Sequence, residues 1–354
     1  MKKNFLITTG GSGGHVIPAT IFYEHLSGIA NLIISTDKRG VKFLEKKKFN
    51  IKIIDTPKLN NIFTLPYNSI KVLYLILKCL YLLKDKKINK VFSTGGYMSL
   101  PIILAAKILG IKIYLIEPNQ VLGRANKFFL NSCTKIFCYT GDLKNFPDKF
   151  RYKIVVISPL VSKKIYNIDL PIQKRDKFCI LIVGGSQGAK FFDNSLKESI
   201  LKLSKKKQIK VIHQTSKENI SYLNDFYSVN KVENQIFSFE PNFSNFLSQA
   251  DLCITRAGAS TLAELSVLKI PFLAIPLPKS KDNHQLENAN FYKNNGCCWI
   301  IDQSNFDTKI EEFLVKIIEN KNEYIKKKKN LEKLNFQNTW ANVNQKILGI
   351  LNEN

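Results

Sequence analysis

The sequence predicts an α/β protein made of two Rossmann-like domains, whose parallel sheets face a cleft. Short apolar runs alternate with segments of helical spacing along all 354 residues, which is typical of parallel sheets with helical crossovers. A glycine-rich turn at residues 10–14 follows the first apolar run, and a second at 184–188 restarts the series half a chain later. A chain of this length can bury two cores, so two domains fit better than one large sheet.

The elements follow in order along each half. In the first half, apolar runs predict strands over residues 5–8, 32–35, 51–54, 90–93, 112–116, 136–139 and 154–157, with helices over 19–26, 68–83 and 101–109 between them. In the second half they predict strands over 178–183, 210–214, 235–239, 252–255, 272–275 and 298–301. We therefore expect an N-terminal domain over 1–160, a C-terminal domain over 161–335, and a terminal helix within 336–354 that packs back toward the N-terminal domain.

The composition restricts the possible partners. Lys and Arg number 53 against 28 Asp and Glu, and the formal net charge of +25 favours an anionic partner: nucleic acid, a phosphate-rich ligand or an acidic membrane surface. Basic and aromatic residues do not interleave on any predicted strand, so we expect no specific nucleic-acid binding. Seven cysteines without a CxxC pair suit a reducing cytoplasm, and with only four histidines we expect no metal site.

The most hydrophobic stretch covers residues 72–83, about half of the ~20 residues that a membrane-spanning helix needs. Lysines interrupt and follow it. Two interpretations remain open from the residues alone: a helix that lies on an anionic membrane surface, or a core helix with a solvated lysine edge. The apolar run at the N-terminus is too short for a secretory signal.

Both glycine-rich turns connect a predicted strand to a predicted helix, which makes a phosphate site from free backbone amides. Neither turn has the G-x-G-x-x-G pattern of dinucleotide-binding proteins, and no P-loop motif is present. Asp37, at the end of the second strand, is a possible ribose-binding acid of a nicotinamide enzyme, but that assignment has no glycine fingerprint to support it.

Two histidines are candidates for a role in the site: one in a glycine turn and one at the end of a predicted strand. His15 closes the first glycine turn, where a neutral imidazole could accept a proton from a hydroxyl group; a helix-start histidine bonded to its own turn is the structural alternative. His213 ends a buried strand and is better interpreted as structural.

Residues 255–264 (TRAGASTLAE) form the stretch richest in possible ligand contacts. A strand ends at Thr255, Ser260 can cap the following helix, and the amides of its first turn could hold a diphosphate. Glu264, one turn further, could accept two hydrogen bonds from a ribose diol. The polar segment 281–289 then offers amide groups that suit sugar hydroxyls.

Seven short segments, spread over nearly the whole chain and in the order found in a known family, carry a resemblance to that family. They are residues 10–19 (GGSGGHVIPA), 95–99 (GGYMS), 117–119 (EPN), 184–189 (GGSQGA), 213–214 (HQ), 256–264 (RAGASTLAE) and 284–289 (HQLENA). In this combination the chain resembles the MurG family. These are GT-B glycosyltransferases that use UDP-GlcNAc to complete the lipid-linked peptidoglycan precursor.

The resemblance implies an inverting transfer of GlcNAc from UDP-GlcNAc to the 4-hydroxyl of undecaprenyl-diphosphate-MurNAc-pentapeptide, with no cofactor or metal. It implies His15 as the general base, with Glu117 as the rival. The residues implied for UDP-GlcNAc are Ser12, Gly13, Gly14, Asn119, Ser186, Glu240, Ala259, Ser260, Thr261, Leu262, Ala263, Glu264 and Gln285. Those implied for the acceptor or its loop are Gly95, Gly96 and Tyr97.

Because the lipid of such an acceptor stays in the bilayer, the resemblance also favours the membrane-surface interpretation of the hydrophobic helix. It implies a peripheral protein on the cytoplasmic face of the inner membrane, where it serves cell-wall synthesis. We assign the apolar patch that touches the anionic membrane surface to four residues: Leu73, Leu75, Ile76 and Leu80.

The sequence departs from the family pattern at three positions. Val161 stands where the family has an arginine, Pro118 where glutamine is common, and Glu240 where an apolar residue usually flanks the uracil.

Two other functions remain possible from the sequence. A UDP-GlcNAc 2-epimerase shares the two-domain architecture but needs several carboxylates around the sugar. A non-catalytic membrane or nucleic-acid binder would use the net charge alone.

Overall fold

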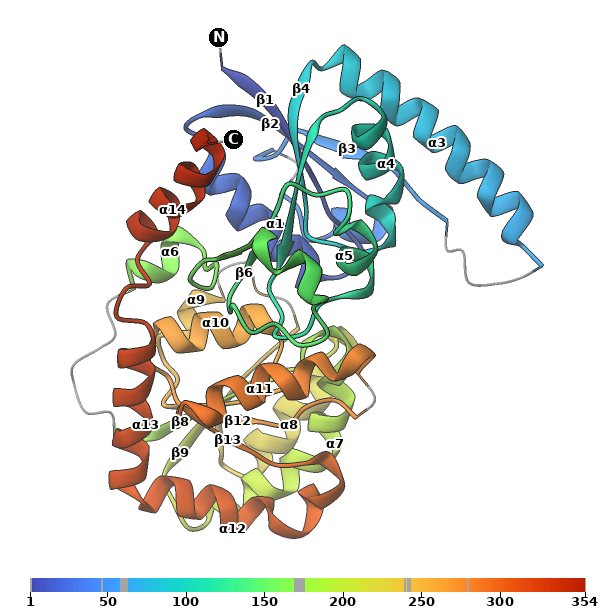
Figure 1. Ribbon diagram of the computed structural model, residues 1–354. Helices are drawn as coiled ribbons and strands as arrows, with labels where there is room; N and C mark the ends of the chain where they lie inside the picture. Colours follow the sequence, from blue (N-terminus) through green and yellow to red (C-terminus); the bar gives the residue numbers. More distant parts are fainter. Residues whose placement is uncertain are drawn as a thin grey trace. The chain divides into compact units, whose positions relative to one another are not determined.

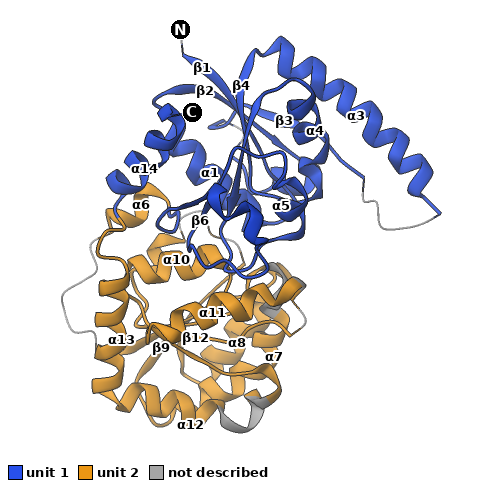
Figure 2. Ribbon diagram, viewed as in Figure 1, with its two compact units in different colours: residues 1–161, 339–354 blue, residues 162–338 orange. Residues whose placement is uncertain are grey.

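The computed structural model describes residues 2–45, 47–57, 63–168, 176–238, 240, 243–278 and 280–353, and the side chains at 186–189, 281, 305 and 307–309 lie outside this description. The chain divides into two compact units (Figure 2). Unit 1 comprises residues 1–161 and 339–354, and unit 2 comprises residues 162–338. These boundaries lie close to the expected ones near 160 and 335.

Unit 1 contains a seven-stranded parallel sheet in the order β3-β2-β1-β4-β5-β6-β7 (Figure 1). Its strands are β1 (Lys3–Thr8), β2 (Ala30–Thr36), β3 (Ile51–Ile53), β4 (Ile88–Ser93), β5 (Lys112–Glu117), β6 (Lys135–Cys138) and β7 (Ile154–Val156). The helices are α1 (Gly13–Leu26), α2 (Lys38–Val41), α3 (Leu65–Asp85), α4 (Leu100–Ile108), α5 (Arg124–Phe129) and α14 (Trp340–Glu353), with 3-10 turns η1 (Tyr97–Ser99) and η2 (Asp148–Lys153).

Unit 2 contains a six-stranded parallel sheet in the order β10-β9-β8-β11-β12-β13. Its strands are β8 (Phe178–Val183), β9 (Ile209–Gln214), β10 (Glu233–Phe237), β11 (Leu252–Thr255), β12 (Phe272–Ala274) and β13 (Cys298–Ile300). The helices are α6 (Lys163–Tyr166), α7 (Gly185–Ser204), α8 (Ile220–Val229), α9 (Ser244–Leu247), α10 (Ala259–Val267), α11 (His284–Asn294), α12 (Phe306–Glu319) and α13 (Lys321–Leu334), with 3-10 turns η3 (Lys217–Asn219), η4 (Lys281–Asn283) and η5 (Gln303–Asn305).

The predicted α/β fold class with two parallel sheets is confirmed. Most strands are apolar on both faces because helices cover both sides of each sheet. In both units the strand order reverses next to the first strand, between β1 and β4 and between β8 and β11. Ligands of such sheets bind beyond the carboxyl ends of the strands at this switch point.

The C-terminal helix α14 belongs to unit 1 although it follows unit 2 in sequence. Val343, Ile347 and Leu351 on α14 are buried in the core that α1 shares with β1 and β2. Its first residue, Trp340, stacks on His25 of α1 with ring centroids 3.7 Å apart. Burial of the ring lowers the pKa of His25 to about 4, so this imidazole is neutral near pH 7 and packs as a flat, uncharged surface.

Candidate functional site

The first glycine turn is held by a buried aspartate. Asp37, after β2, accepts hydrogen bonds from the backbone N–H of Gly11 and of Gly40 (both 2.9 Å) and from Arg39 Nε (2.9 Å). Burial acts to raise the pKa of Asp37, but these bonds outweigh it and lower the pKa below its ordinary value. A Cβ at Gly10 would come within 2.7 Å of the same carboxylate. Asp37 is therefore committed to the turn, which argues against its role as a ribose-binding acid.

The turn leaves amides of α1 available. Ser12 is the N-cap residue and makes no side-chain cap bond, and its carbonyl accepts from His15 and Val16. Among the described residues, the N–H groups of Gly13 and Gly14 have no hydrogen-bond partner. A Cβ at Gly14 would make only an ordinary 3.7 Å contact with Ser12. The free amides and open space suit an anionic ligand at the start of α1.

His15 is fixed from the loop after β4. Its Nδ1 lies 2.8 Å from the carbonyl oxygen of Thr94. A carbonyl oxygen only accepts hydrogen bonds, so Nδ1 carries the proton and the lone pair of the neutral ring is on Nε2. No described residue bonds to Nε2. The geometry gives His15 the tautomer and orientation that a general base needs.

The loop that holds His15 requires its two glycines. Gly95 and Gly96 both have φ near +85°, and a Cβ at Gly96 would come within 2.3 Å of Met98 Sδ. Ser93 and Ser99 close the loop through their hydroxyl groups. Tyr97 receives a hydrogen bond from Arg39, so this loop and the Asp37 turn are connected.

Glu117 is at the carboxyl end of β5, is 3% exposed, and accepts four hydrogen bonds. They come from the backbone and side-chain nitrogens of Asn119 (3.3 and 3.0 Å), Gly123 N (2.8 Å) and Asn126 Nδ2 (2.9 Å). The resemblance implies Glu117 as the rival general base. This geometry argues against that role, because both carboxylate oxygens already organise the segment 119–126.

In unit 2, the N-terminus of α10 follows β11 directly. Gly258 is its N-cap residue, and its carbonyl accepts from Leu262. The amides of Ala259, Ser260 and Thr261 have no partner among the described residues. A Cβ at Gly258 would meet nothing within 4 Å, and its φ of −65° is open to any residue. No neighbouring atom of the described protein requires glycine there. A ligand that approaches this backbone closely would require the absence of a side chain.

Ala257, just before this N-cap, has a left-handed φ of 60°, which is unusual for alanine. Its carbonyl accepts a hydrogen bond from the buried Asn288 of α11 at 3.2 Å. Asn288 thus stabilises the turn that leads into α10. The sequence places Asn288 in the polar segment expected to contact sugar hydroxyls, but it does not predict this buried contact, because the two residues lie on different elements.

Glu264 lies one turn into α10. Its carboxylate has no hydrogen-bond or ion-pair partner among the described residues. Part of its side chain reaches the surface. Desolvation by the surrounding protein raises the pKa of Glu264 to about 8. An unpartnered, desolvated carboxylate is suited to accept hydrogen bonds from hydroxyl groups of a ligand.

The other residues implied for UDP-GlcNAc in unit 2 are Ser186, Glu240 and Gln285. Gln285, in the first turn of α11, accepts from Leu277 N at 2.8 Å through Oε1, and its Nε2 has no partner in the described part of the chain. Gln214 Oε1 accepts from Gly185 N (3.0 Å) and fixes the second glycine turn. The side chain of Ser186 lies outside the described residues. Glu240 is partly exposed, beyond β10.

His213 is fully buried, in agreement with its interpretation as structural. Its Nδ1 lies 3.2 Å from the Tyr227 hydroxyl group, and its Nε2 is 3.4 Å from Asp193 Oδ1. Burial lowers the pKa of His213. Asp193 also accepts from Thr215 and Asn219 (2.7 and 2.9 Å), so this group ties α7 to the end of β9.

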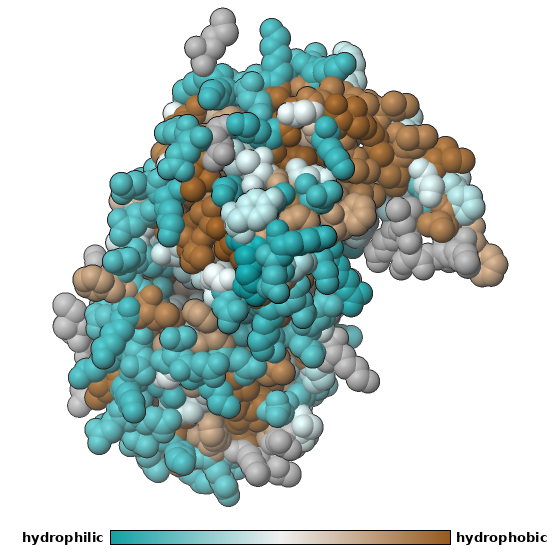
Figure 3. Space-filling view, viewed as in Figure 1, coloured by the Kyte–Doolittle hydropathy of each residue, from teal (hydrophilic) through white to brown (hydrophobic). Residues whose placement is uncertain are grey.

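The exposed face of α3 differs from the predicted patch. Of the four residues assigned to it, Leu73 is 60% exposed, but Leu75 is buried in the core and Ile76 and Leu80 pack partly against that core. The face instead consists of Leu73 with five residues at alternating spacings of three and four: Tyr67, Ile70, Tyr74, Leu77 and Tyr81. Figure 3 shows apolar surface over this helix, at upper right. We call these six residues the α3 face.

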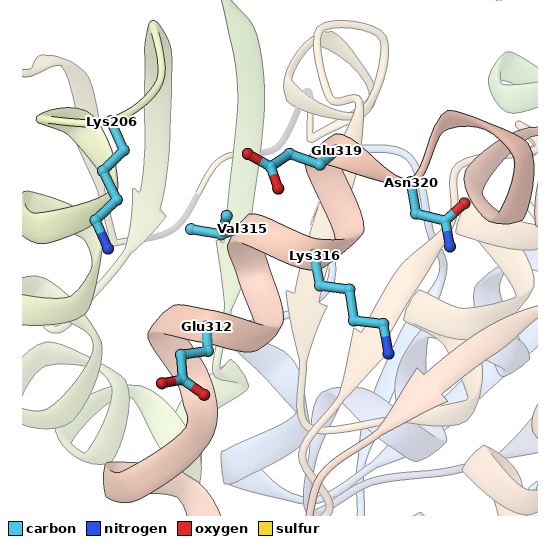
Figure 4. A pocket seen from close by; sticks show the side chains of 6 residues that line it. All are labelled: Lys206, Glu312, Val315, Lys316, Glu319 and Asn320. Atoms are coloured by element: carbon cyan, nitrogen blue, oxygen red, sulfur yellow. The ribbon is translucent and has the colours of Figure 1, made fainter.

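A shallow hollow of about 450 Å³ lies elsewhere on unit 2, along α12 (Figure 4). Its lining is Lys206, Glu312, Val315, Lys316, Glu319 and Asn320. None of the predicted site residues is among them. In the described parts of the chain, no group of His, Cys, Asp and Glu is arranged to hold a metal ion, and no helix is long and apolar enough to cross a membrane.

Comparison with family models gives matches to both halves of the chain. Residues 5–138 match the glycosyltransferase family 28 N-terminal domain, and residues 179–343 match the glycosyltransferase family 28 C-terminal domain. A protein of Pelagibacter ubique is 48% identical over the full length of both chains. One of Rickettsia felis is 33% identical over 90% of each chain. Both are named UDP-N-acetylglucosamine–N-acetylmuramyl-(pentapeptide) pyrophosphoryl-undecaprenol N-acetylglucosamine transferase.

Solved structures with the same fold include MurG of Acinetobacter baumannii, with a TM-score of 0.74, 23% identity and coverage of 94% of this chain and 95% of that one. The UDP-GlcNAc 2-epimerase of Neisseria meningitidis, solved with UDP-GlcNAc bound, has a TM-score of 0.68 at 16% identity and covers 99% of this chain and 100% of its own. At these identities the likeness concerns the fold, which a transferase and an epimerase share.

Proposed function

Because the chain belongs to the MurG family of glycosyltransferases, we propose that it transfers GlcNAc from UDP-GlcNAc to the 4-hydroxyl of undecaprenyl-diphosphate-MurNAc-pentapeptide. This step converts lipid I to lipid II in peptidoglycan synthesis. The observation that carries the proposal is the 48% identity over the full length to a relative named for this reaction.

The donor is assigned mainly to unit 2. The free amides at the start of α10 and the positive end of its dipole would bind the diphosphate, whose charge grows as UDP leaves. Glu264 would accept hydrogen bonds from the ribose diol, and the free amide nitrogen of Gln285 would donate to a GlcNAc hydroxyl. Ser186 and Glu240 remain predictions for the diphosphate and the uracil.

The acceptor side is assigned to unit 1. Nε2 of His15 would take the proton of the 4-hydroxyl as its oxygen attacks the anomeric carbon, and the configuration at that carbon would invert. Ser12, Gly13, Gly14 and Asn119 would contact the donor from this unit, and Gly95, Gly96 and Tyr97 would line the acceptor loop. Glu117 would act by holding Asn119 in place.

The epimerase alternative has less support. Its fold matches this chain, but an epimerase would need several carboxylates free to act on the sugar. In the first unit, Glu117 and Asp37 are both occupied by hydrogen bonds from their own loops. The family relatives are transferases.

The α3 face is the proposed contact with the membrane that contains the acceptor lipid, on its cytoplasmic side. Three tyrosines and three aliphatic residues would enter the headgroup region, and exposed lysines at 71, 78, 84, 86 and 87 would attract anionic lipids. The charge of +25 acts in the same direction. The protein would thus be peripheral, bound to the inner membrane by this helix.

The test is UDP release from purified protein supplied with UDP-GlcNAc and a short-chain lipid-linked MurNAc-pentapeptide. We expect release that depends on the acceptor, together with a disaccharide-lipid product. Equal UDP release without acceptor, or formation of ManNAc, would contradict the transferase assignment.

A further inference from the structure

Arg256 is a buried cation that the proposed function does not yet use. It is 4% exposed and follows β11 directly. Its guanidinium donates to the carbonyl oxygen of Ile275 at 3.1 Å and lies over two aromatic rings of α7, with distances of 4.5 Å to the Phe191 centroid and 4.8 Å to that of Phe192. These contacts fix its plane but do not neutralise its charge.

No carboxylate of the described residues lies within ion-pair distance of Arg256, and its Nε has no hydrogen-bond partner there. Desolvation lowers the pKa of Arg256 to about 10, so the group is still charged near pH 7. Buried charges are usually paired, because an unpaired charge in a low dielectric is costly. Lys327 in the same unit has such a pairing, since its Nζ lies 3.6 Å from Glu323 Oε1.

The position of Arg256 connects it with the donor site. It precedes Gly258, the N-cap of α10, by two residues, and the carbonyl that it binds follows β12. Phe191 and Phe192 lie on the helix that begins at the second glycine turn. The guanidinium therefore lies between Ile275, just after β12, and α7, the helix that follows β8. β8 and β11 are the two strands at the switch point of this sheet.

We propose that Arg256 is an uncompensated buried cation whose field stabilises the diphosphate of UDP as it leaves. In the transfer, the bond between the anomeric carbon and the β-phosphate oxygen breaks and its electron pair remains on that oxygen. The acceptor oxygen bonds to the carbon and loses its proton to the base. The diphosphate gains one negative charge, and a fixed cation on the residue two before the N-cap of α10 stabilises that state more than the uncleaved donor. This inference rests on the proposed function.

The test compares UDP with uridine, which lacks the phosphates, as ligands of the full-length protein. Arg256→Met keeps an apolar chain between the two rings and removes the charge, whereas Arg256→Lys keeps the charge. Lys327→Met is the control: it removes a buried cation of the same unit that also stacks on an aromatic ring but is paired with Glu323, and it should leave UDP affinity unchanged. We expect Arg256→Met to lose about tenfold or more in UDP affinity and in kcat. Its uridine affinity should be unchanged, and Arg256→Lys should recover most of the loss.

Thermal unfolding separates this role from a structural one. Arg256→Met replaces an unpaired buried charge by an apolar side chain, so Tm should be unchanged or higher. A large fall in Tm, an equal loss of uridine and UDP affinity, or an unchanged UDP affinity would each overturn the inference. If the wild-type protein itself does not bind UDP, the proposed function fails instead.

Discussion

Nδ1 of His15 lies 2.8 Å from the carbonyl oxygen of Thr94, and this bond joins the first turn of α1, just after β1, to the loop after β4. These two strands are neighbours at the switch point of the unit 1 sheet. The bond crosses the place where a parallel sheet of this kind binds its ligand, and it leaves Nε2 as the accepting nitrogen.

His15→Ala should therefore reduce turnover without loss of donor binding. General base catalysis contributes about a hundredfold or more, so we expect kcat to fall by at least that factor. Acceptor-dependent UDP release measures kcat, and calorimetric titration with UDP measures binding. Thr20→Ala, on the same helix, should change neither. A parallel loss of UDP affinity and turnover would make His15 a donor contact instead.

Glu117→Gln should lower the free energy of unfolding, because this carboxylate has a structural role. The carboxylate accepts four hydrogen bonds, and an amide group would place N–H donors against the N–H donors of Gly123 or Asn119. A buried mismatch of this kind costs about 1–3 kcal/mol, which urea unfolding would detect. Full stability with turnover abolished would restore Glu117 as the rival base.

The sequence predicts the strands and the two glycine turns well, because runs of apolar residues that end in glycine leave few alternatives. It does not distinguish the roles of carboxylates at strand ends. Glu117 becomes a structural group only through Gly123 and Asn126, which the fold brings to it. Arg256 lies in the segment 256–264 that carries the family resemblance, but its burial depends on two phenylalanines of another helix.

The α3 face shows a different limit of prediction. Residues 72–83 are apolar on both sides of the helix, so the sequence could not say which side packs on the sheet. The structure buries Leu75, Cys79 and Leu83 and exposes Tyr74 and Leu77. The prediction of Leu75 as a membrane contact is wrong because leucines lie on both sides of this helix and Leu75 is on the buried side.

Tyr74→Ser together with Leu77→Ser should weaken binding to anionic vesicles, because both side chains are exposed on the α3 face. Cosedimentation with vesicles that contain anionic lipid measures the effect, and activity on a soluble acceptor should be retained. Val229→Ser, which changes an 81% exposed apolar residue of unit 2, is the control. Vesicle binding that is equal in both variants and the wild type would exclude the α3 face as the contact.

Glu264 gives the donor site a pH dependence with a definite sign. Its pKa is about 8 in the folded protein, raised from 4.5 by desolvation. The protonated folded form is therefore favoured: the stability that this group contributes is fully present below its unfolded pKa and is lost as pH rises through 8. The wild type should become less stable relative to Glu264→Gln between about pH 5 and pH 8.

UDP-GlcNAc binding should change in the opposite direction. Ribose hydroxyl groups donate to a carboxylate, so the donor selects the ionised form of Glu264 and releases a proton when it binds. Affinity should rise by up to about tenfold per pH unit from pH 6 to pH 8 and then level off. Glu264→Gln should bind more weakly at pH 8 and show little pH dependence. Titration calorimetry in two buffers of different ionisation enthalpy would count the proton, and a wild-type affinity that is flat across this range would show that Glu264 does not bind the donor as a carboxylate.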